Sequence, residues 1–506
     1  MHFDVIVVGL GPVGAVLAGL LGKRGVKTLV LERDQKVFAL PRAAHVDHTG
    51  LRTIQEVGCL NEILKGSVRN RGLDLLDAEK RLLVRIPADR NSISGLPTSV
   101  YFYQPDFDTT LREFAQTNLD LTIKLGANVT SIRQNDSCVT IEYTDSKNDS
   151  YSATADWLVG CDGSWSFTRE SQGIRLQSLN FDEPWLVLDL LLKGDSEKLP
   201  KDYVIEVADP SRPYLSTPIS PNRQRFEFML LPDEKPEDIQ KSKVIEYFLK
   251  DWIEPSNYSV ERSAVYTFHG LIAEKWRDNR IFLAGDAAHQ TPPFLGQGMC
   301  AGIRDVANLA WKLDRVIKGL SIEALLDTYE SERKPHALKV VEAAIRIGKV
   351  VCDLDPTNAE TRNKKLLTGD PDEQKKLAFA LPKIEPGALI TKSGGALFPQ
   401  VMLDGRLTDE IFGNSFAILV RSIDSIDPDL LSLAEALNAK VLSIDKLQIP
   451  AFERVLSNYQ YLVVRPDRYI CGGFETTDEF LEEIGPALLS PEILKSVREI
   501  LVPQSQ

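Results

Sequence analysis

The chain has 506 residues, 43% of them hydrophobic and 26% charged, which is enough to form roughly two to four globular domains with cores of their own. Its formal net charge of −13 argues against nucleic acid or an anionic membrane surface as a partner, because charges of like sign repel over long range. The six cysteines lie far apart, without a C-x-x-C pair or a His at metal-ligand spacing, so we expect a reducing, cytoplasmic location and no metal site.

The N-terminal residues 3–22 are apolar enough to resemble a signal peptide or a membrane span. Asp4, however, stands where a basic flank is expected, and several glycines and Pro12 interrupt the run. No other run approaches the length that a bilayer requires. We therefore expect a soluble protein without a membrane partner.

The same N-terminal stretch predicts one βαβ unit. Residues 3–9 are β-branched and typical of a buried strand, residues 12–25 change to helical spacing and end at a glycine, and residues 26–32 form a second buried strand. A right-handed crossover places two such strands in a parallel sheet.

Two later segments, 155–163 and 279–288, each predict a short buried strand that runs directly into Gly and Asp. Between them, Pro- and Asn-rich turns divide several strands, which is the pattern of an antiparallel sheet. These strands are expected over 185–192, 202–208, 225–230 and 262–270.

The second half of the chain begins with helices. Apolar residues at helical spacing after Gly302 predict a long amphipathic helix, and a second helical block covers about 321–352. The polar, Pro- and Gly-punctuated residues 355–376 indicate a boundary or an exposed crossing segment. From about residue 400, alternating strands and helices predict a small separate α/β domain.

A glycine pattern lies at the first strand-to-helix turn. Gly9, Gly11 and Gly14 fit G-x-G-x-x-G, in which glycines permit a tight turn and free N–H groups at the helix start attract a pyrophosphate. Glu32 ends the second strand, where a carboxylate can accept from the ribose hydroxyls of an adenosine. The alternative is a packing turn without a ligand. The full βαβ context favours a dinucleotide, without choosing between a nicotinamide and a flavin.

Two further motifs place an Asp at the end of a buried strand. Asp162 is followed by Gly163, Ser166 and Arg169, and Gly285 precedes Asp286. A carboxylate at such a position needs donors, which a ribityl chain and pyrophosphate-bound water would provide. Either motif by itself is equally compatible with a helix N-cap.

Together these three stretches resemble the FAD-dependent aromatic hydroxylases, single-component flavoprotein monooxygenases built like para-hydroxybenzoate hydroxylase. Residues 280–313, RIFLAGDAAHQTPPFLGQGMCAGIRDVANLAWKL, are most similar to the branch of 3-(3-hydroxyphenyl)propionate hydroxylase and phenol hydroxylase. The resemblance extends over about 3–350 and continues weakly into the C-terminal part. It implies an α/β (α+β) chain with a Rossmann-like FAD-binding domain, an interleaved antiparallel-sheet substrate domain and a C-terminal thioredoxin-like domain without a redox C-x-x-C.

The first two domains implied by this resemblance are each built from separate segments of the chain. We assign 1–75, 100–180 and 270–350 to the FAD-binding domain, and 76–99 with 181–269 to the substrate-binding sheet. A helical linker over 351–399 would lead to the thioredoxin-like domain over 400–506.

The resemblance also implies roles for the residues near the cofactor. FAD would be held by the glycine pattern, by Glu32 with Arg33 at the adenosine, by Asp286 at the ribityl chain, and by a loop from Pro292 to Met299 around the flavin edge. The complete set of expected FAD contacts is Gly9, Gly11, Gly14, Glu32, Arg33, Arg42, Gln104, Asp162, Arg169, Gly285, Asp286, Gly296, Gly298 and Met299. Many relatives carry Asn where this chain has Cys300, which is harmless if the backbone makes the flavin contact, whereas a thiol there could react with hydroperoxide.

The implied chemistry is reduction of FAD by NADH or NADPH, formation of a flavin hydroperoxide with dioxygen, and hydroxylation of an electron-rich aromatic ring. A phenolic substrate reacts better as a phenolate, which requires a nearby base or hydrogen-bond network. We name Asp47, His48 and Pro292 as catalytic candidates, although a histidine satisfied within the core is the more common case. Tyr214, Arg225 and His269 are the substrate candidates, with a core aromatic and a cross-strand charge pair as alternatives for the first two.

Three other functions compete with this interpretation. A flavin-dependent halogenase would carry W-x-W, and none of the six tryptophans is spaced in that way. A hydroxylase of a large polycyclic or polyketide substrate differs only in pocket size, and a non-catalytic flavin-binding protein would lack turnover. The sequence leaves the substrate, the choice of NADH or NADPH and a homodimer open.

Overall fold

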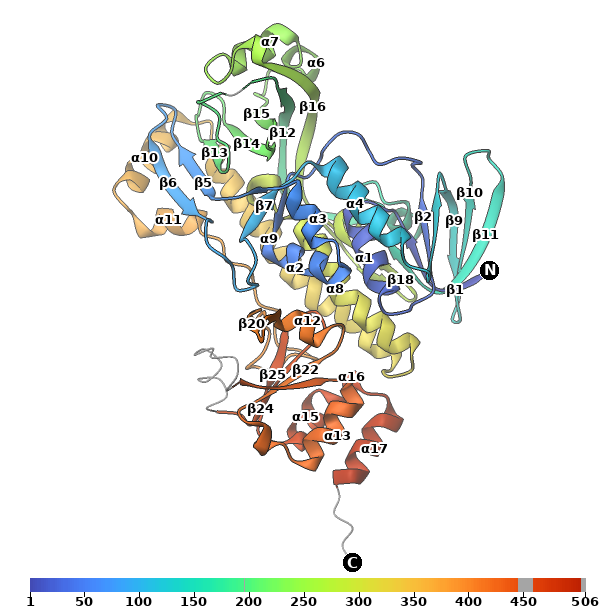
Figure 1. Cartoon of the computed structure of the whole chain (residues 1–506). Coiled ribbons are helices and arrows are strands. Elements are labelled where there is room, and N and C mark those ends of the chain that lie inside the picture. The colour runs from blue at the N-terminus through green and yellow to red at the C-terminus, as the bar shows by residue number, and fades with distance from the viewer. Residues whose placement is uncertain (195, 445–457, 502–506) are drawn as a thin grey trace, which may run out of the picture.

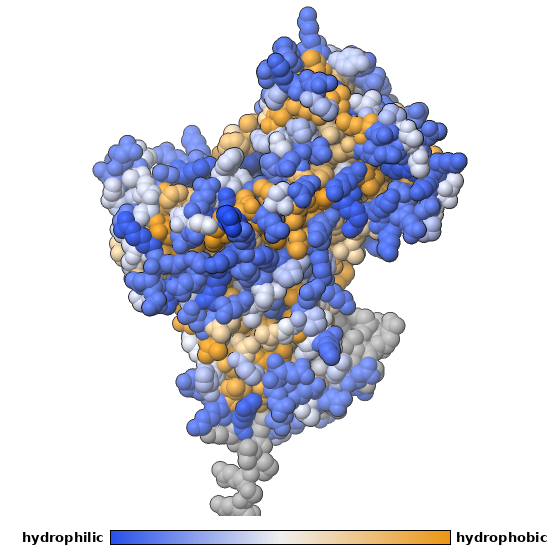
Figure 2. All heavy atoms as spheres, turned by 180° about the vertical axis from the view of Figure 1, so that it is seen from behind, coloured by the Kyte–Doolittle hydropathy of each residue, from blue (hydrophilic) through white to orange (hydrophobic). Residues whose placement is uncertain are grey.

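The computed structural model describes residues 1–194, 196–444 and 458–501 (Figure 1). Over these residues the chain forms two eight-stranded sheets, a four-stranded sheet in the C-terminal part, and two smaller sheets. Hydrophilic residues cover most of the face in Figure 2. Among the described residues, none of the helices combines the length and the apolar composition that crossing a membrane requires.

The first sheet has a parallel centre in the order β18, β11, β1, β2 and β8. Its strands are β1 (His2–Val8), β2 (Thr28–Glu32), β8 (Leu121–Leu125), β9 (Asn128–Gln134), β10 (Val139–Thr144), β11 (Ser150–Gly160), β17 (Arg277–Asp278) and β18 (Ile281–Leu283). Val5, Ile6 and Val7 are fully buried, because both faces of β1 are covered. The helix α1 (Pro12–Gly22) crosses from β1 to β2, which confirms the predicted βαβ unit.

The second sheet is antiparallel apart from one parallel pair, β13 with β5. In spatial order its strands are β19 (His289–Gln290), β16 (Tyr258–Ala273), β12 (Leu176–Leu192), β15 (Arg223–Met229), β14 (Tyr214–Ser220), β13 (Val204–Val207), β5 (Gly72–Leu76) and β6 (Leu82–Pro87). The predicted antiparallel sheet is thus present. It begins at Gly72 and Leu176, a few residues before the expected domain boundaries at 76 and 181.

The two faces of this second sheet have different neighbours. On one face, Leu186, Leu188, Phe226 and Phe228 belong to an apolar cluster that also includes Trp252. This face is covered by α6 (Pro236–Ile239) and α7 (Ser242–Leu249), and η1 (Pro255–Asn257) leads from there into β16. The other face is turned toward the helix α9 (Asp327–Val351) and the first half of the chain.

Short elements connect the two large sheets near their contact. They are β3 (His45–Asp47), α2 (His48–Val57), α3 (Leu60–Lys65), β4 (Val68–Arg69), β7 (Ser99–Tyr101), α4 (Gln104–Gln116), α5 (Phe167–Ser171), η2 (Gly285–Ala287) and η3 (Pro293–Leu295). The strands β3, β7 and β4 pair as a small antiparallel sheet.

The predicted long helix is α8 (Gly298–Ile317), which begins four residues before Gly302. The helix α8 packs against α1 and against α9. The short helix η4 (Glu323–Leu326) connects α8 to α9 in the chain. Residues 355–376, within the expected helical linker, form α10 (Pro356–Leu367) and α11 (Pro371–Leu377). Asp355 and Asp370 cap these helices and each precedes a proline at the first helical position, so the Pro and Gly punctuation marks the starts of two helices.

The C-terminal part forms a lobe at one end of the molecule (Figure 1). Its sheet has the order β23, β22, β24 and β25, with one parallel and two antiparallel pairs, as in a thioredoxin-like domain. Trp311 of α8 packs edge-on against Phe416 at 5.5 Å and joins the two parts. The elements are β20 (Met402–Leu403), β21 (Arg406–Leu407), α12 (Thr408–Phe412), β22 (Ala417–Val420), η5 (Ile423–Ser425), α13 (Pro428–Leu437), β23 (Lys440–Ser443), β24 (Tyr461–Val464), β25 (Ile470–Phe474), α15 (Thr477–Glu483), α16 (Gly485–Leu488) and α17 (Pro491–Leu501).

Candidate active site

The three predicted motifs meet at one edge of the first sheet. β1, β11 and β18 are adjacent and parallel, so the residues that follow them lie side by side. Arg169 is buried and donates to Ser164 O at 3.1 Å and to Ala287 O at 3.3 Å. This guanidinium therefore ties the Asp162 motif to the Gly285–Asp286 motif.

The three glycines of the first turn serve different needs. A Cβ atom on Gly9 would lie 2.5 Å from Cys161 O, and one on Gly14 would lie 2.0 Å from Gly9 O, so packing alone requires both glycines. A Cβ on Gly11 would meet no atom within 4 Å. Gly11 is also the N-cap residue of α1 and makes no side-chain cap. Open space beside uncapped helix N–H groups is the environment that a pyrophosphate needs.

Glu32 is fixed at the end of β2. Its carboxylate accepts from Leu10 N at 2.7 Å and from Asp34 N at 2.9 Å, and it lies 3.6 Å from Arg112. These contacts aim the carboxylate at the glycine turn. Arg33 is exposed and lies 3.9 Å from Asp34.

The two Asp motifs differ in how much of their hydrogen bonding the protein satisfies. Asp162 accepts from Ser166 Oγ at 2.5 Å and from Thr168 N at 2.8 Å, while the N-cap residue of α5 is Ser166, which accepts from Arg169 N at 2.9 Å. Asp286 is exposed, and no donor among the described residues contacts its carboxylate. Desolvation by the surrounding protein nevertheless raises the pKa of Asp286, with His289 and Arg42 acting against the shift. Asp286 is therefore an acceptor in a partly enclosed position, as ribityl hydroxyls require.

Gln104 shapes the backbone beside Arg42. Its side-chain oxygen accepts from Arg42 N at 2.6 Å and from Ala43 N at 2.7 Å, and Gln104 itself is buried. The Arg42 guanidinium is exposed and lies 5.5 Å from the Phe38 ring centroid. Arg42 is thus available to a phosphate, whereas Gln104 positions the backbone.

Residues 292–299, called the flavin loop from here on, connect the Asp286 motif to α8. Pro292 is buried and precedes η3. Gly296 has a φ of +61°, and its carbonyl lies 3.1 Å from His45 Nδ1. A Cβ on Gly298 would have its nearest neighbour at 3.9 Å, so the protein itself leaves room there, and Met299 packs against the main core.

Several hydrogen-bond donors surround the Asp47 carboxylate. It caps α2 through Thr49 N and Gly50 N, both at 3.0 Å, and accepts from Gln297 Nε2 at 3.0 Å and Arg304 Nη1 at 2.9 Å. Burial would raise the pKa of Asp47, but Arg304 and the cap outweigh it and hold the pKa well below its usual range. Asp47 is therefore a fixed anion that anchors the flavin loop through Gln297.

The histidines near this anchor differ in their contacts. His48 Nδ1 lies 2.9 Å from Ser94 Oγ, and burial lowers the pKa of His48. Burial likewise lowers the pKa of His45, the residue that contacts the flavin loop. His289 is buried and lies 2.7 Å from Asp305, which orders the start of the loop.

The three substrate candidates do not come together. Tyr214 stacks on Phe228 at 5.6 Å on the face covered by α7, where burial raises its pKa to about 12. His269 lies 2.5 Å from Asp182 in a partly exposed position. Arg225 reaches the site, but its guanidinium pairs with Asp189 at 2.6 Å, which matches the cross-strand alternative.

Cys300 is buried between Asp47 and the flavin loop. Its sulfur accepts from Asp47 N at 3.3 Å and lies 3.7 Å from Gly296 O, and the residue is fully buried. Burial raises the pKa of the Cys300 thiol, which disfavours the reactive thiolate. The thiol therefore has a packing role between α8 and the flavin loop.

The sequence did not single out several residues that the structure places here. Arg304 and Gln297 flank Asp47, and the buried glutamates Glu206 and Glu227 lie on the second sheet. Each glutamate interrupts an otherwise apolar strand, in YVIEVA and RFEFML, which is the signal that could have identified them.

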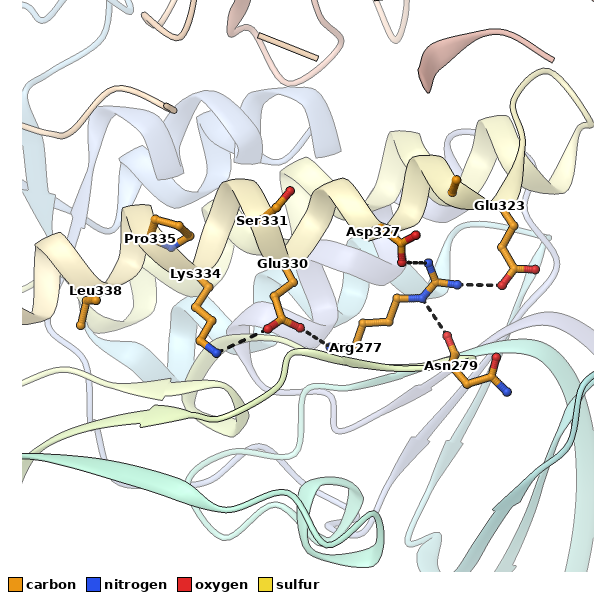
Figure 3. A pocket seen from close by; sticks show the side chains of 10 residues that line it. Arg277, Asn279, Glu323, Asp327, Glu330, Ser331, Lys334, Pro335 and Leu338 are labelled. Atoms are coloured by element: carbon orange, nitrogen blue, oxygen red, sulfur yellow. Dashed lines mark hydrogen bonds and ion pairs between the residues drawn. The ribbon is translucent and has the colours of Figure 1, made fainter. Parts of the chain in front are cut away.

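A surface pocket of about 920 Å³ lies elsewhere, between α9 and the β17 region (Figure 3). Its charges are already paired: Arg277 contacts Asp327 at 2.6 Å and Glu323 at 2.7 Å, and Glu330 accepts from Arg277 N at 3.1 Å. Its chemistry does not resemble that of a phosphate or flavin site. No group of three or more His, Cys, Asp or Glu side chains suited to a metal occurs in the described part of the chain.

Known proteins resemble this chain in sequence and in fold. A family model described as an FAD binding domain matches residues 2–344. A probable NADH-specific resorcinol 4-hydroxylase of Rhodococcus jostii is 36% identical over 421 residues, covering 82% of this chain and 78% of the relative. A 3-(3-hydroxy-phenyl)propionate/3-hydroxycinnamic acid hydroxylase of Mycolicibacterium smegmatis is 34% identical over 438 residues, covering 82% and 76%.

Solved structures share the fold at lower identity. The rebeccamycin biosynthetic enzyme RebC with reduced flavin superposes with a TM-score of 0.80 and 20% identity, covering 96% of this chain and 99% of the other. Aklavinone-11 hydroxylase with FAD and aklavinone gives a TM-score of 0.79 and 23% identity, covering 98% and 99%. The chain therefore belongs to the family of FAD-dependent aromatic hydroxylases and carries their FAD binding domain.

Proposed function

We propose that this chain is a single-component monooxygenase that binds FAD, takes electrons from a reduced nicotinamide, and hydroxylates a small phenolic compound with dioxygen. The observation that carries the proposal is the junction of the three motifs at one sheet edge. There, Gly11 leaves open space beside a helix start and Asp286 offers an unused carboxylate. These are the two features that packing of the protein does not explain and that a flavin dinucleotide would use.

The residues present are compatible with FAD. Glu32 would bind the adenosine ribose, the turn from Gly9 to Gly14 the pyrophosphate, and Asp286 the ribityl hydroxyls. When bound, FAD supplies the hydride acceptor and the centre at which dioxygen is activated. The flavin loop would exclude water, and its anchor at Asp47 would keep it in place.

NADH is the donor to test first, because the Rhodococcus relative is named as NADH-specific. Several points remain predictions. They are the residues assigned to FAD, catalysis and substrate, the domain boundaries, a cytoplasmic location and a homodimer. The structural neighbours share only the fold at 20–23% identity and therefore do not favour the polycyclic-substrate alternative.

The direct test measures three properties of the purified protein. We expect it to bind FAD and turn yellow, to oxidise NADH faster when a phenol is added, and to release a product heavier by one oxygen atom that derives from ¹⁸O₂. A colourless protein that takes up no FAD would overturn the proposal. So would NADH oxidation that no aromatic compound stimulates.

A further inference from the structure

A row of side chains crosses the second sheet on one face and contains two glutamates. Glu206 of β13 lies opposite Leu215 of β14, Leu215 lies opposite Glu227 of β15, and Glu227 lies opposite Val187 of β12. Residues directly opposite one another in neighbouring strands point to the same side of a sheet. Both carboxyl groups therefore project from the same face.

This row lies between the two segments that enclose the proposed flavin site. Two residues before Glu227, Arg225 donates to Arg42 O at 2.8 Å and to Pro41 O at 2.9 Å. Two residues before Val187, Trp185 meets Phe294 of the flavin loop edge-on at 5.8 Å. Since residues two apart in a strand share a face, the row lies on the stretch of sheet between these two contacts.

Both glutamates are buried, and the carboxyl group of each receives too few hydrogen bonds from the protein. Glu206 is 3% exposed and Glu227 is 6% exposed. One oxygen of each, Glu206 Oε1 and Glu227 Oε2, has no hydrogen-bond partner among the described residues. A buried carboxyl group of this kind is costly unless something donates to it, so the arrangement calls for a donor from outside the chain.

On this face, two guanidinium groups contact Asp189. Arg225 lies 3.9 Å from Glu227 but binds Asp189 at 2.6 Å, and Arg262 contacts Pro41 O and lies 3.4 Å from Asp189. Burial and the neighbouring Glu227 raise the pKa of Glu206 to about 8, and burial also raises the pKa of Glu227. Among the described residues of this face, Arg262 Nε is the one nitrogen of these two guanidinium groups that is buried without a hydrogen-bond partner.

Tyr101 adds a polar group next to the same row. It is 2% exposed and lies beside Thr217, which is opposite Arg225 in the sheet. The region thus offers hydrogen-bonding oxygens within an otherwise apolar wall that includes Leu75 and Trp185.

We propose that Glu206 and Glu227 accept hydrogen bonds from the hydroxyl groups of the substrate ring, and that they restrict the substrate to neutral, polyhydroxylated aromatic compounds. This inference rests on the proposed function. A phenolic O–H supplies the donor that each glutamate lacks, whereas the carboxylate of a ring acid is a further acceptor that supplies no donor and is itself costly to bury. The two named relatives differ in this respect, since resorcinol is neutral and hydroxyphenylpropionate is an anion.

The test compares three ligands on the FAD-loaded wild-type enzyme: resorcinol, 3-methoxyphenol and 3-(3-hydroxyphenyl)propionate. Dissociation constants come from the change in flavin absorbance, and kcat/KM from stimulated NADH oxidation. We expect resorcinol to bind at least about tenfold more tightly than either other ligand, because one further hydrogen bond to an otherwise unpartnered buried carboxyl group contributes about that factor.

The variants Glu206→Gln and Glu227→Gln keep the side-chain shape and replace one carboxyl oxygen with an amide NH2 group, which cannot accept a hydrogen bond. We expect each to weaken resorcinol binding by about tenfold and to narrow the preference for resorcinol over the propionate. Glu261→Gln is the matched control. Glu261 lies on β16 of the same sheet and pairs with Arg223 at 2.8 Å, outside the row, so binding should change less than about twofold.

The outcomes separate this inference from the proposed function. If phenols are hydroxylated but both glutamine variants bind resorcinol as the wild type does, or if the wild type prefers the propionate, the inference is wrong and the function stands. If no phenol leads to oxygen incorporation, the proposed function itself fails. If a variant does not fold, the preference of the wild-type enzyme among the three ligands alone tests the inference.

Discussion

Arg304 and Asp47 form a buried ion pair with Nη1 and Oδ2 2.9 Å apart, which joins α8 to the start of α2. Gln297 of the flavin loop contacts both partners, at 2.7 Å from Arg304 and 3.0 Å from Asp47. The loop that would enclose the flavin is thus attached to the core by a charge pair near its C-terminal end. Loss of this ion pair should therefore weaken FAD binding more than it changes proton transfer during the reaction.

Asp47→Asn tests this relationship. Removing one partner of a buried pair leaves Arg304 uncompensated, so we expect a loss of stability of about 3 kcal/mol and weaker FAD binding. The pH dependence of kcat should stay unchanged, because the low pKa of Asp47 keeps it from acting as a base. Thermal unfolding, FAD titration and a pH–rate profile measure these effects, with the exposed Asp149→Asn as control. A large fall in kcat with intact FAD binding would instead support the catalytic role predicted from the sequence.

Gly11→Ala separates ligand binding from packing. A Cβ there meets no protein atom within 4 Å, so the apoprotein should keep its melting temperature while its affinity for FAD falls by at least about tenfold. Gly14→Ala places a Cβ 2.0 Å from Gly9 O and should destabilise the protein itself. Calorimetry of the apoproteins and FAD titration distinguish the two. Unchanged FAD affinity in Gly11→Ala would exclude a cofactor at this turn.

Glu206→Gln should alter the pH dependence of stability. Because burial raises the pKa of Glu206 from 4.5 to about 8, the folded state binds more protons than the unfolded state between these values, and stability is lost as pH rises. The glutamine variant avoids this loss. We expect it to resemble the wild type near pH 5 and to be more stable by on the order of 3 kcal/mol at pH 8.5. Urea unfolding across this range measures the difference, with Glu261→Gln as control, and parallel curves for wild type and Glu206→Gln would contradict it.

Cys300 should resist thiol reagents in the folded enzyme. It is fully buried, and burial raises the pKa of its thiol, so the reactive thiolate is scarce. We expect a maleimide to label Cys138, which is partly exposed, and to spare Cys300 until the protein is denatured. Peptide mass spectrometry identifies the labelled sites. Oxidation of Cys300 during turnover would show that the thiol does meet peroxide.

Asp409→Asn should loosen the C-terminal lobe. Asp409 receives two hydrogen bonds from buried Arg52, at 2.5 and 2.6 Å, and also lies 3.4 Å from Arg468. Breaking this contact should cost about 3–5 kcal/mol and expose the segment before residue 400 to proteases. Limited proteolysis and unfolding curves test this, with the exposed Asp404→Asn as control. An unchanged proteolysis pattern would mean that other contacts hold the lobe.

The fold class and the three cofactor motifs could be predicted from the sequence because their signals are local. The strand before Gly9, the helix after it and the position of Glu32 depend on residue spacing and on glycine within one short segment. Other local patterns allow more than one interpretation. The prolines of residues 355–376 indicated a boundary or a crossing segment within the expected helical linker, and in the structure they begin two helices, each after a capping Asp.

By itself, then, the sequence determined a chain that contains an FAD binding domain with its glycine turn and its Asp-ended strands. Only the tertiary structure decided which charged groups meet. Asp47 and Arg304 are far apart in the chain, and Glu206 and Glu227 become neighbours through the register of three strands. Such contacts depend on how separate elements pack, and residue spacing along one segment carries no information about that packing.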